Sequence, residues 1–369
     1  MTIPFLDLRA AYLELKDDID TAVSRVLDSG WYILGGEVDA FEDEWARYCE
    51  AHHAVGVANG LDALTLALRA LDIGPGHEVI VPSNTYIATW LAVSAVGATP
   101  IPVEPDPATH NIDPTRIEAA ITPRTRALLP VHLYGLPCDL DPILTIGRQH
   151  GLAVVEDAAQ AHAARYKGRR IGSHGDIVCW SFYPGKNLGA MGDAGAVTTN
   201  RADLAERLRI LRNYGSREKY VNDVQGVNSR LDPLQAAILR AKLHHLDTWI
   251  DRRREIAACY LEGLVQTDLV LPHVPDWAEH AWHLFVIRSA DRPKLQQHLS
   301  DAGIGTLIHY PIPPHRQAAF ADLGLSAGQL PIAEQLATEV LSLPIGPHLK
   351  PEEAEVVVSS VSVTVTKGK

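Results

Sequence analysis

The stretch that decides the fold is GLAVVEDAAQAH, residues 151–162. Its apolar residues predict a short buried strand that ends at Glu156 and Asp157. Ligands of open α/β sheets bind outside the carboxyl ends of the strands, so the Asp157 carboxylate could hydrogen-bond a protonated ring nitrogen of a cofactor. The same aspartate, followed by Ala-Ala-Gln, would also suit the N-cap of a helix. This stretch alone leaves both interpretations open.

A second strand and a glycine-rich turn follow in residues 176–197, DIVCWSFYPGKNLGAMGDAGAV. Lys186 alone among the lysines follows a buried strand end and leads into glycines, where the backbone can approach a ligand closely. A desolvated lysine has a lowered pKa and can form a Schiff base with a carbonyl compound. A solvated turn lysine is commoner in proteins, but an aspartate and a lysine at neighbouring strand ends favour the functional interpretation.

The segment VANGLDA, residues 57–63, predicts a strand that passes through Gly60 directly into a helix. The N–H groups of Gly60 and Leu61 then face outward at the positive end of the helix dipole, where a phosphate can bind. Joints of this kind are also common packing devices, so the signal is weak by itself. Tyr86 follows the next strand and could stack flat on a planar ring, although an aromatic there is more often part of the core.

Short apolar strands alternate with helical patterns over the first two-thirds of the chain. Such alternation predicts an α/β fold, a mostly parallel sheet with helices on both faces. We expect strands at His53–Ala58, Glu78–Pro82, Thr99–Val103, Ala127–Val131, Ala153–Val155, Asp176–Phe182 and Gly195–Thr199, and helices at Ala40–Tyr48, Leu61–Leu71, Thr85–Val96, Asp139–His150 and Ala202–Tyr214.

The texture changes after Asp232. One long helix is predicted from Pro233 to Tyr260, and it carries the run Arg252-Arg253-Arg254. A short strand at Trp282–Ile287, a helix at Arg292–Ala302 and an alternating tail at Glu355–Thr366 follow, which together indicate a smaller α+β domain. We therefore divide the chain into a large domain with an N-terminal helical segment, residues 1–245, and a small domain, residues 246–369.

Composition excludes several classes of protein. The 369 residues carry a net charge of −12, which argues against nucleic-acid and anionic membrane surfaces as partners. Four widely spaced cysteines and an N-terminus without a signal peptide favour a cytoplasmic protein. His244 and His245 point different ways on a helix, so we expect no metal. No dinucleotide motif, P-loop or hydrolase triad is present.

Taken together, the motifs resemble those of the DegT family, nucleotide-sugar aminotransferases that use pyridoxal phosphate and have fold type I. The likeness extends over nearly the whole chain, and several motifs in the right order make it specific. It rests on PFLDL (residues 4–8), EDAAQAH (156–162), SFYPGK (181–186), GVNSRL (226–231) and HYP (309–311).

The resemblance implies a role for each matching residue. Lys186 would bond covalently to pyridoxal phosphate and later move a proton, while Asp157 would pair with the pyridine nitrogen. Gln160 would bond the ring hydroxyl, and Tyr86 would stack on the ring. The mechanism implied is transfer of an amino group from an amino acid, with glutamate as the expected donor, to a nucleotide-diphosphate keto sugar.

The phosphate of the cofactor would be held by Ser181 and by the N–H groups of Gly60 and Leu61. Asn228 would complete that site from the other subunit, which makes a homodimer with shared active sites obligatory. The resemblance also assigns substrate contacts, to Tyr183, Lys219, His309 and Tyr310.

Two positions depart from the common pattern. Many relatives have Ser-Gly-Thr where this chain has Asn59-Gly60-Leu61, so phosphate binding there must depend on backbone donors. Many also have histidine at the position of Tyr183. The loop Asn59–Asp62 looks most like members that aminate C-3 of thymidine-diphosphate-linked 3-keto-6-deoxyhexoses.

Other functions remain open at this point. Amination at C-4 of a 4-keto sugar is one alternative, and a non-catalytic regulatory protein that binds pyridoxal phosphate is another. Related sugar dehydratases replace the reactive lysine with histidine, and Lys186 speaks against that class.

Overall fold

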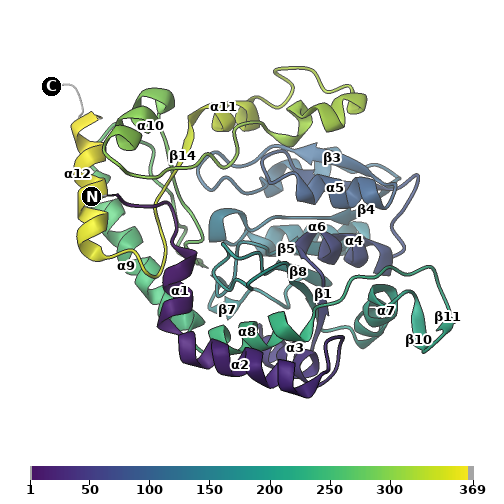
Figure 1. Ribbon diagram of the computed structural model, residues 1–369. Helices are drawn as coiled ribbons and strands as arrows, with labels where there is room; N and C mark the ends of the chain where they lie inside the picture. Colours follow the sequence, from purple (N-terminus) through teal and green to yellow (C-terminus); the bar gives the residue numbers. More distant parts are fainter. Residues whose placement is uncertain (1, 365–369) are drawn as a thin grey trace.

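A seven-stranded sheet forms the centre of the molecule, in a computed structural model that describes residues 2–364 (Figure 1). The strand order is β1-β9-β8-β5-β4-β2-β3, and only β9 runs against the others. The strands are β1 (His53–Val57), β2 (Glu78–Pro82), β3 (Thr99–Val103), β4 (Thr125–Leu128), β5 (Ala153–Asp157), β8 (Ile177–Ser181) and β9 (Gly195–Thr199). The predicted mostly parallel sheet is confirmed.

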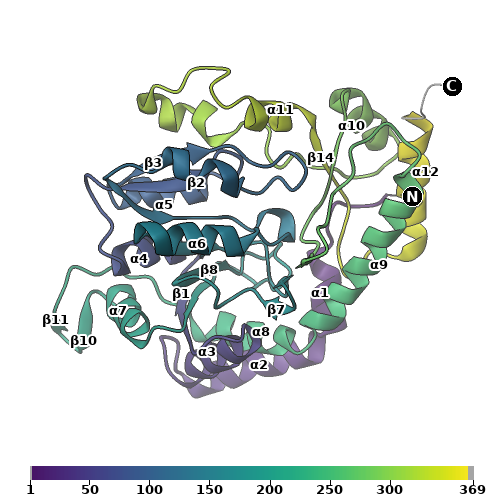
Figure 2. The same cartoon turned by 180° about the vertical axis from the view of Figure 1, so that it is seen from behind.

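Helices cover both faces of this sheet, as predicted (Figures 1 and 2). Alternate residues of each strand enter different cores, because successive side chains of a strand point to opposite faces. One core packs against α4 (Gly60–Ala70), α5 (Ala88–Ala95) and α7 (Ala202–Arg212). The other packs against α3 (Gly36–Tyr48), α6 (Leu140–His150) and α8 (Pro233–Leu243).

The N-terminal segment is helical, with α1 (Leu8–Glu14) and α2 (Lys16–Ser29). The Asp7 carboxylate caps α1 by accepting hydrogen bonds from the backbone N–H groups of Arg9 and Ala10. The α2 helix lies along α8, where Ile19 packs against Ile238 and Trp249 in a small apolar cluster.

The C-terminal part has a core of its own. It contains α9 (Leu246–Leu264), α10 (Arg292–Asp301), α11 (Pro331–Glu339), α12 (Pro351–Thr364) and the strands β13 (Phe285–Arg288) and β14 (Val340–Leu343). Ile3 also enters this core, since the N-terminal chain crosses back to it. The domain boundary between residues 245 and 246 stays a prediction.

Two small sheets lie outside the central sheet. A small three-stranded sheet has the order β12-β6-β7, and β10 and β11 form a hairpin beyond α7. Their bounds are β6 (Arg165–Tyr166), β7 (Arg169–Arg170), β12 (Ala278–Glu279), β10 (Ser216–Glu218) and β11 (Val221–Asn222).

The prediction of one helix over Pro233–Tyr260 is wrong. The chain forms α8 and α9, which meet at His244 and His245. The reason is packing: the apolar side of α8 faces the sheet, whereas that of α9 faces the C-terminal core from Ile256 onward, so the axis must turn.

The alternating tail at Glu355–Thr366 is also not a strand-like element. It lies within α12 up to Thr364, and residues 365 and 366 lie outside the described part. Ala354, Val357 and Val361 recur at helical spacing and are fully buried, so burial on one side decides the conformation.

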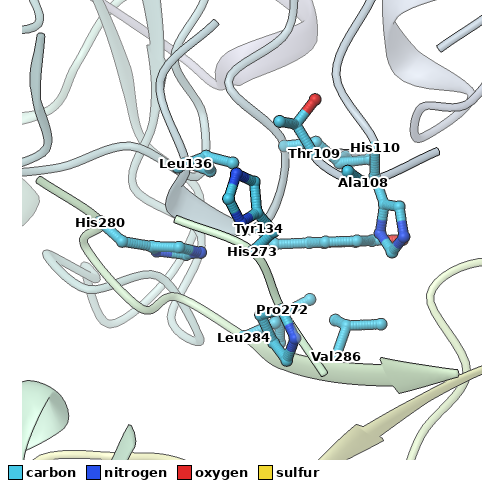
Figure 3. A pocket seen from close by; sticks show the side chains of 11 residues that line it. Ala108, Thr109, His110, Tyr134, Leu136, Pro272, His273, His280, Leu284 and Val286 are labelled. Carbon is cyan, nitrogen blue, oxygen red and sulfur yellow. The ribbon is translucent and has the colours of Figure 1, made fainter. Parts of the chain in front are cut away.

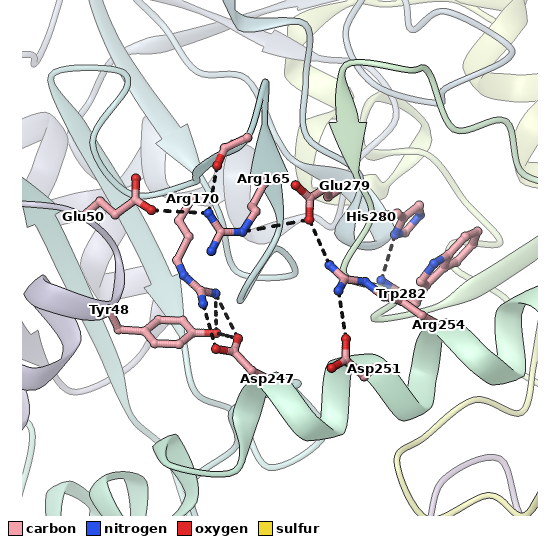
Figure 4. A network of polar contacts seen from close by, with 11 residues as sticks. Tyr48, Glu50, Arg165, Arg170, Asp247, Asp251, Arg254, Glu279, His280 and Trp282 are labelled. Carbon is pink, nitrogen blue, oxygen red and sulfur yellow. Dashed lines mark hydrogen bonds and ion pairs between the residues drawn. The ribbon is translucent and has the colours of Figure 1, made fainter.

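Polar contacts fix α9 against the large domain (Figure 4). Asp247 accepts hydrogen bonds from Tyr48 (2.6 Å) and from Arg170 (2.8 Å), both of the large domain. Farther along α9, Arg254 donates to Asp251 (2.9 Å) and to Glu279 (3.3 Å). None of the helices in residues 2–364 is long and apolar enough to cross a membrane.

Candidate active site

The carboxyl ends of β5 and β8 bring two of the predicted site residues together. Asp157 is opposite Cys179 in the parallel register, and Ser181 lies two residues farther along β8. Because side chains alternate along a strand, Asp157 and Ser181 project from the same face of the sheet. This is the face covered by α4 and α5.

Asp157 is held in one orientation. Its carboxylate accepts hydrogen bonds from the Thr89 hydroxyl (2.9 Å) and from the Ala159 N–H (3.1 Å). Burial raises the pKa of Asp157, while these two donors and the charge of Lys186 act in the opposite direction. No helix begins after Asp157, since residues 158–164 form turns, so the N-cap interpretation is wrong.

Lys186 lies in the turn that follows β8, where its N–H donates to the Tyr183 carbonyl (2.8 Å). Burial lowers the pKa of the Lys186 amine to about 8, and the negative charge of Asp157 opposes that shift. An amine with such a pKa is neutral often enough near pH 8 to act as a nucleophile or a base. The structure therefore joins the predicted lysine and aspartate electrostatically.

The predicted phosphate loop lies against Ser181. Asn59 caps α4 by accepting a hydrogen bond from the Asp62 N–H (2.8 Å). The N–H groups of Gly60 and Leu61 belong to the first turn of the helix and therefore have no helical partners. A Cβ atom at Gly60 would lie only 2.6 Å from the Ser181 Cβ. The loop and the hydroxyl thus form one concave surface at a helix N-terminus, which is suited to an anion.

Gln160 connects this edge to the C-terminal part. Its Oε1 accepts a hydrogen bond from the Tyr134 N–H (2.6 Å), and its Nε2 donates to the Tyr310 hydroxyl (3.0 Å). The rings of Tyr310 and Tyr86 lie 5.2 Å apart. Tyr86 is 53% exposed, so it is not a core aromatic and its face is open to a ligand.

The predicted substrate residues fall into two groups. His309 and Tyr310 lie near Gln160, and the His309 ring contacts the Ser342 hydroxyl at 2.8 Å. Burial lowers the pKa of His309 to about 4, so its ring is neutral near pH 7. Tyr183 is exposed beside Lys186.

Lys219 lies away from this edge, whereas the segment that carries Asn228 approaches the phosphate loop, since the Ser229 hydroxyl accepts a hydrogen bond from the Ala58 N–H (3.1 Å). Lys219 is exposed at the turn of the β10–β11 hairpin, which projects past α7 on the side of the molecule away from α9 (Figure 1). Asn228 is exposed in the strand-like segment that returns from this hairpin, where it bridges to Asn213.

Sequence reasoning missed Thr89 and Tyr134. Neither has a recognisable motif, because Thr89 is one threonine in a helical stretch and Tyr134 acts through its backbone N–H. The Tyr134 hydroxyl also donates to the His309 carbonyl. Behind its ring is a cavity of about 20 Å³, lined also by His110, His273 and His280, with room for about one water molecule (Figure 3).

These residues fit pyridoxal phosphate. A buried carboxylate and an anion cradle lie on one face of the sheet edge, the half-buried Lys186 follows in the next turn, and Gly60 leaves the cradle open where a side chain would fill it. Asp157 and Lys186 would hold the ring and the aldehyde end, and Gly60, Leu61 and Ser181 the phosphate. The class defined by this arrangement is a cofactor-dependent transferase built on an α/β sheet.

Comparison with known proteins identifies the family. Residues 14–362 match the DegT/DnrJ/EryC1/StrS aminotransferase family, and the chain belongs to it. It is 59% identical to the erythromycin biosynthesis sensory transduction protein EryC1 of Saccharopolyspora erythraea, covering 98% of this chain and 99% of that one. It is 58% identical to a dTDP-3-amino-3,4,6-trideoxy-alpha-D-glucose transaminase of Streptomyces venezuelae, covering 97% and 95%.

Solved structures agree. The crystal structure of S. venezuelae DesV superimposes with a TM-score of 0.98 at 56% identity, and each chain is covered completely. The structure of NtdA from Bacillus subtilis, which has the cofactor PMP bound, superimposes with a TM-score of 0.91 at 34% identity, covering 98% of this chain and 84% of that one. The predicted family, fold type, enzyme class and cofactor are confirmed.

Proposed function

We propose that this aminotransferase moves an amino group from glutamate to C-3 of a thymidine-diphosphate-linked 3-keto-6-deoxyhexose. The proposal is carried by the amino sugars for which two similar transaminases are named, together with the presence of Lys186 and Asp157 in this chain. Besides the Streptomyces enzyme, a dTDP-3-amino-3,6-dideoxy-alpha-D-galactopyranose transaminase of Aneurinibacillus thermoaerophilus is 58% identical over 98% of this chain. Both names specify a 3-amino sugar without a 6-hydroxyl group on dTDP.

Asp157 and Gln160 orient the cofactor. Pyridoxal phosphate, when bound, supplies a conjugated ring that accepts the electron pair left on the substrate carbon. The Asp157 carboxylate, fixed by Thr89, keeps a proton on the ring nitrogen and so favours that delocalisation. Gln160 has its Oε1 occupied by the Tyr134 N–H, so the Nε2 amide is the group that donates to the ring hydroxyl.

Lys186 carries the proton. Its Nζ would remove the proton from the α-carbon of the amino donor as general base and deliver it as general acid to the cofactor, and a pKa near 8 suits both directions. In the second half of the reaction the same Nζ would deliver a proton to C-3 of the sugar, the carbon that gains the amino group. Tyr86 covers the ring, and Ser181 with the N–H groups of Gly60 and Leu61 holds the phosphate.

A second subunit is proposed to complete the active site, with Asn228 at the cofactor phosphate and Lys219 at the substrate. The hairpin that carries Lys219 projects from the chain with Tyr220 88% exposed, and a protruding hairpin of this kind can reach a neighbouring molecule. We therefore assign Lys219 and Asn228 to the active site of the partner in a homodimer, and Tyr183, His309 and Tyr310 to the sugar in the chain's own site. The four described cysteines are free, which is consistent with a reaction in the cytoplasm.

Two alternatives differ in what they require. Amination at C-4 would need a 4-keto sugar, and the names of the relatives above specify position 3. A regulatory role has support in names alone: one relative, 46% identical, is called a pleiotropic regulatory protein of Geobacillus stearothermophilus, and EryC1 is called a sensory transduction protein. Such a role needs no base, and Lys186 and Asp157 are both present.

The test is a substrate panel. Purified holoenzyme with glutamate is given 3-keto and 4-keto 6-deoxyhexoses on dTDP, UDP and GDP, and the amino sugar is identified by mass and by NMR. We expect a 3-amino product from the dTDP-3-keto sugar, with 2-oxoglutarate in equal amount. Formation of a 4-amino sugar alone, or of no amino sugar, would contradict the proposal. Alanine and aspartate in place of glutamate test the donor.

A further inference from the structure

The run Arg252-Arg253-Arg254 contains three arginines with very different surroundings. Arg252 donates to Glu14 (2.9 Å), and Arg254 is paired with Asp251 and Glu279 as described above. Both are partly exposed ion pairs, which usually contribute little to stability. Arg253 is only 3% exposed, and it forms no ion pair with any residue from 2 to 364. The middle arginine therefore needs another explanation.

The Arg253 guanidinium uses one nitrogen for its protein contacts. Nη1 donates to the carbonyl oxygens of Trp282 (3.0 Å), His283 (3.4 Å) and Ile345 (3.3 Å). Within the described chain, Nε and Nη2 have no hydrogen-bond acceptor. Burial lowers the pKa of Arg253 to about 9, because only neutral groups compensate its charge. Two donors of a fixed planar fork thus remain free for an anion.

A cavity of about 300 Å³ lies beside Arg253. Its wall is formed by α1, by the ends of α8 and α9, and by the turn of residues 184–191 that contains Lys186. Arg253, Lys242 and Lys186 all line it. A molecule in this cavity therefore contacts both Arg253 and Lys186.

The cavity has a positive electrostatic character. Lys242 is 6% exposed and donates to the Gly189 carbonyl (2.7 Å), and it has no acidic partner in residues 2–364. Burial lowers the pKa of Lys242 to about 8. The lining residue His348 is paired with Glu14, and Asp7, the one lining carboxylate, is exposed and caps α1. Two buried cations, Arg253 and Lys242, and the half-buried Lys186, with one acid at the rim, favour an anionic ligand.

We propose that this cavity binds a carboxylate of the amino donor, a dicarboxylic amino acid, with Arg253 and Lys242 as its partners. The inference rests on the proposed function, because the donor must bring its amino group to the cofactor carbon that Lys186 would hold, where it would displace the Lys186 amine. A guanidinium fork matches a carboxylate in a bidentate manner. The diphosphate of the nucleotide sugar is the other anion that reaches this active site. At about 300 Å³ the cavity is at the lower end of the size range of ligand pockets, which suits an amino acid and not a nucleotide-linked sugar.

The test is calorimetric binding to the holoenzyme. Glutarate, a five-carbon dicarboxylate without an amino group, is titrated into the wild type and into Arg253→Met. We expect the variant to bind glutarate at least ~10-fold more weakly, the loss typical for a charged hydrogen bond. Arg252→Met and Arg254→Met are matched controls on the same helix, and we expect them to bind glutarate as the wild type does. Unfolding temperatures show whether each variant is folded.

Thymidine diphosphate is the second ligand, since it distinguishes the two anions. We expect its affinity to stay within ~2-fold of wild type in Arg253→Met. Weaker binding of thymidine diphosphate with unchanged glutarate binding would overturn the proposal and assign the cavity to the diphosphate. If Arg253→Met does not fold, Lys242→Met decides in its place, because it removes the other cation of the wall.

Failure of this proposal is distinguishable from failure of the proposed function. Unchanged glutarate binding in Arg253→Met and Lys242→Met would overturn the carboxylate site, as would a wild type that does not bind glutarate, even if the wild type aminates the 3-keto sugar. Loss of glutarate binding in the variants would support the site even if the sugar panel gives no product.

Discussion

The sheet edge at Asp157 and the hairpin at residues 214–228 are built in opposite ways. At the sheet edge, Asp157, Gln160 and Ser181 have hydrogen-bond partners within the same chain. In the hairpin, the large side chain of Tyr220 is 88% exposed, and the Lys219 amine lies over that ring. The difference agrees with our proposal that one chain supplies most of the cofactor contacts, whereas Asn228 and Lys219 act in the active site of a partner subunit.

The largest effect is expected from Lys186→Ala. The variant lacks the amine that forms the covalent link and moves the proton, so turnover should fall by at least ~1,000-fold, within the range for loss of a general base. Product is measured by mass spectrometry, and circular dichroism checks the fold. A variant with a near wild-type rate would show that Lys186 is not the reactive amine and would contradict the assignment of the sheet edge as the cofactor site.

The next effect is expected from Asp157→Asn. The amide keeps the size of the carboxylate and can still accept from Thr89, but it carries no charge to retain the ring proton. We expect a ~100-fold lower kcat, the scale of losing one electrostatic stabiliser. Thr89→Val is the companion variant, with a smaller loss. A decrease of only a few-fold in Asp157→Asn would mean that the carboxylate merely holds the turn at Ala159.

The hairpin is tested by mixing Lys186→Ala with Asn228→Ala. Each hybrid dimer would contain one site with both defects and one with neither, so random exchange should restore about a quarter of wild-type activity. The experiment requires that Asn228→Ala alone is severely impaired, and native mass spectrometry confirms that subunits exchange. Hybrids without activity would mean that Asn228 acts within its own chain.

The smallest effect is expected from Gly60→Ala. The added methyl group would lie 2.6 Å from the Ser181 Cβ and disturb the phosphate cradle, so the cofactor should bind ~10-fold more weakly. Gly36→Ala is a matched control, since Gly36 also begins a helix and no atom lies within 4 Å of its added Cβ. Cofactor affinity is measured by fluorescence. Equal affinities in both variants would contradict the cradle.

Much of the sheet could be predicted because its strands are short, apolar and bounded by glycine or proline. The β2 strand is found at Glu78–Pro82 as expected, and β9 at Gly195–Thr199. The turn between α8 and α9 could not be predicted, since His244 and His245 are both compatible with a helix and only the packing of two separate cores bends the chain. The α12 helix could not be predicted either, because its sequence alternates like that of a strand, although Ala354, Val357 and Val361 form one buried side of a helix.

Some residues of the candidate site could be predicted from the sequence, and others could not. Asp157, Gln160 and Lys186 are recognisable because they follow strand ends in motifs. The burial of Arg253 between two exposed arginines has no signal in the sequence, because three successive helical positions point in three directions and only the fold selects one. Tyr134 contributes a backbone N–H, a group that every residue except proline has.

The pairing of β5 with β8 has a consequence for how such an enzyme can change. Asp157 and Ser181 sit on hydrogen-bonded neighbours in fixed register, so their separation is a property of the sheet and not of any loop. Inserting one residue into either strand would turn the following side chains to the opposite face. Loops around this edge are free to diverge or to be exchanged by design for new sugars, provided that the two strands keep their length.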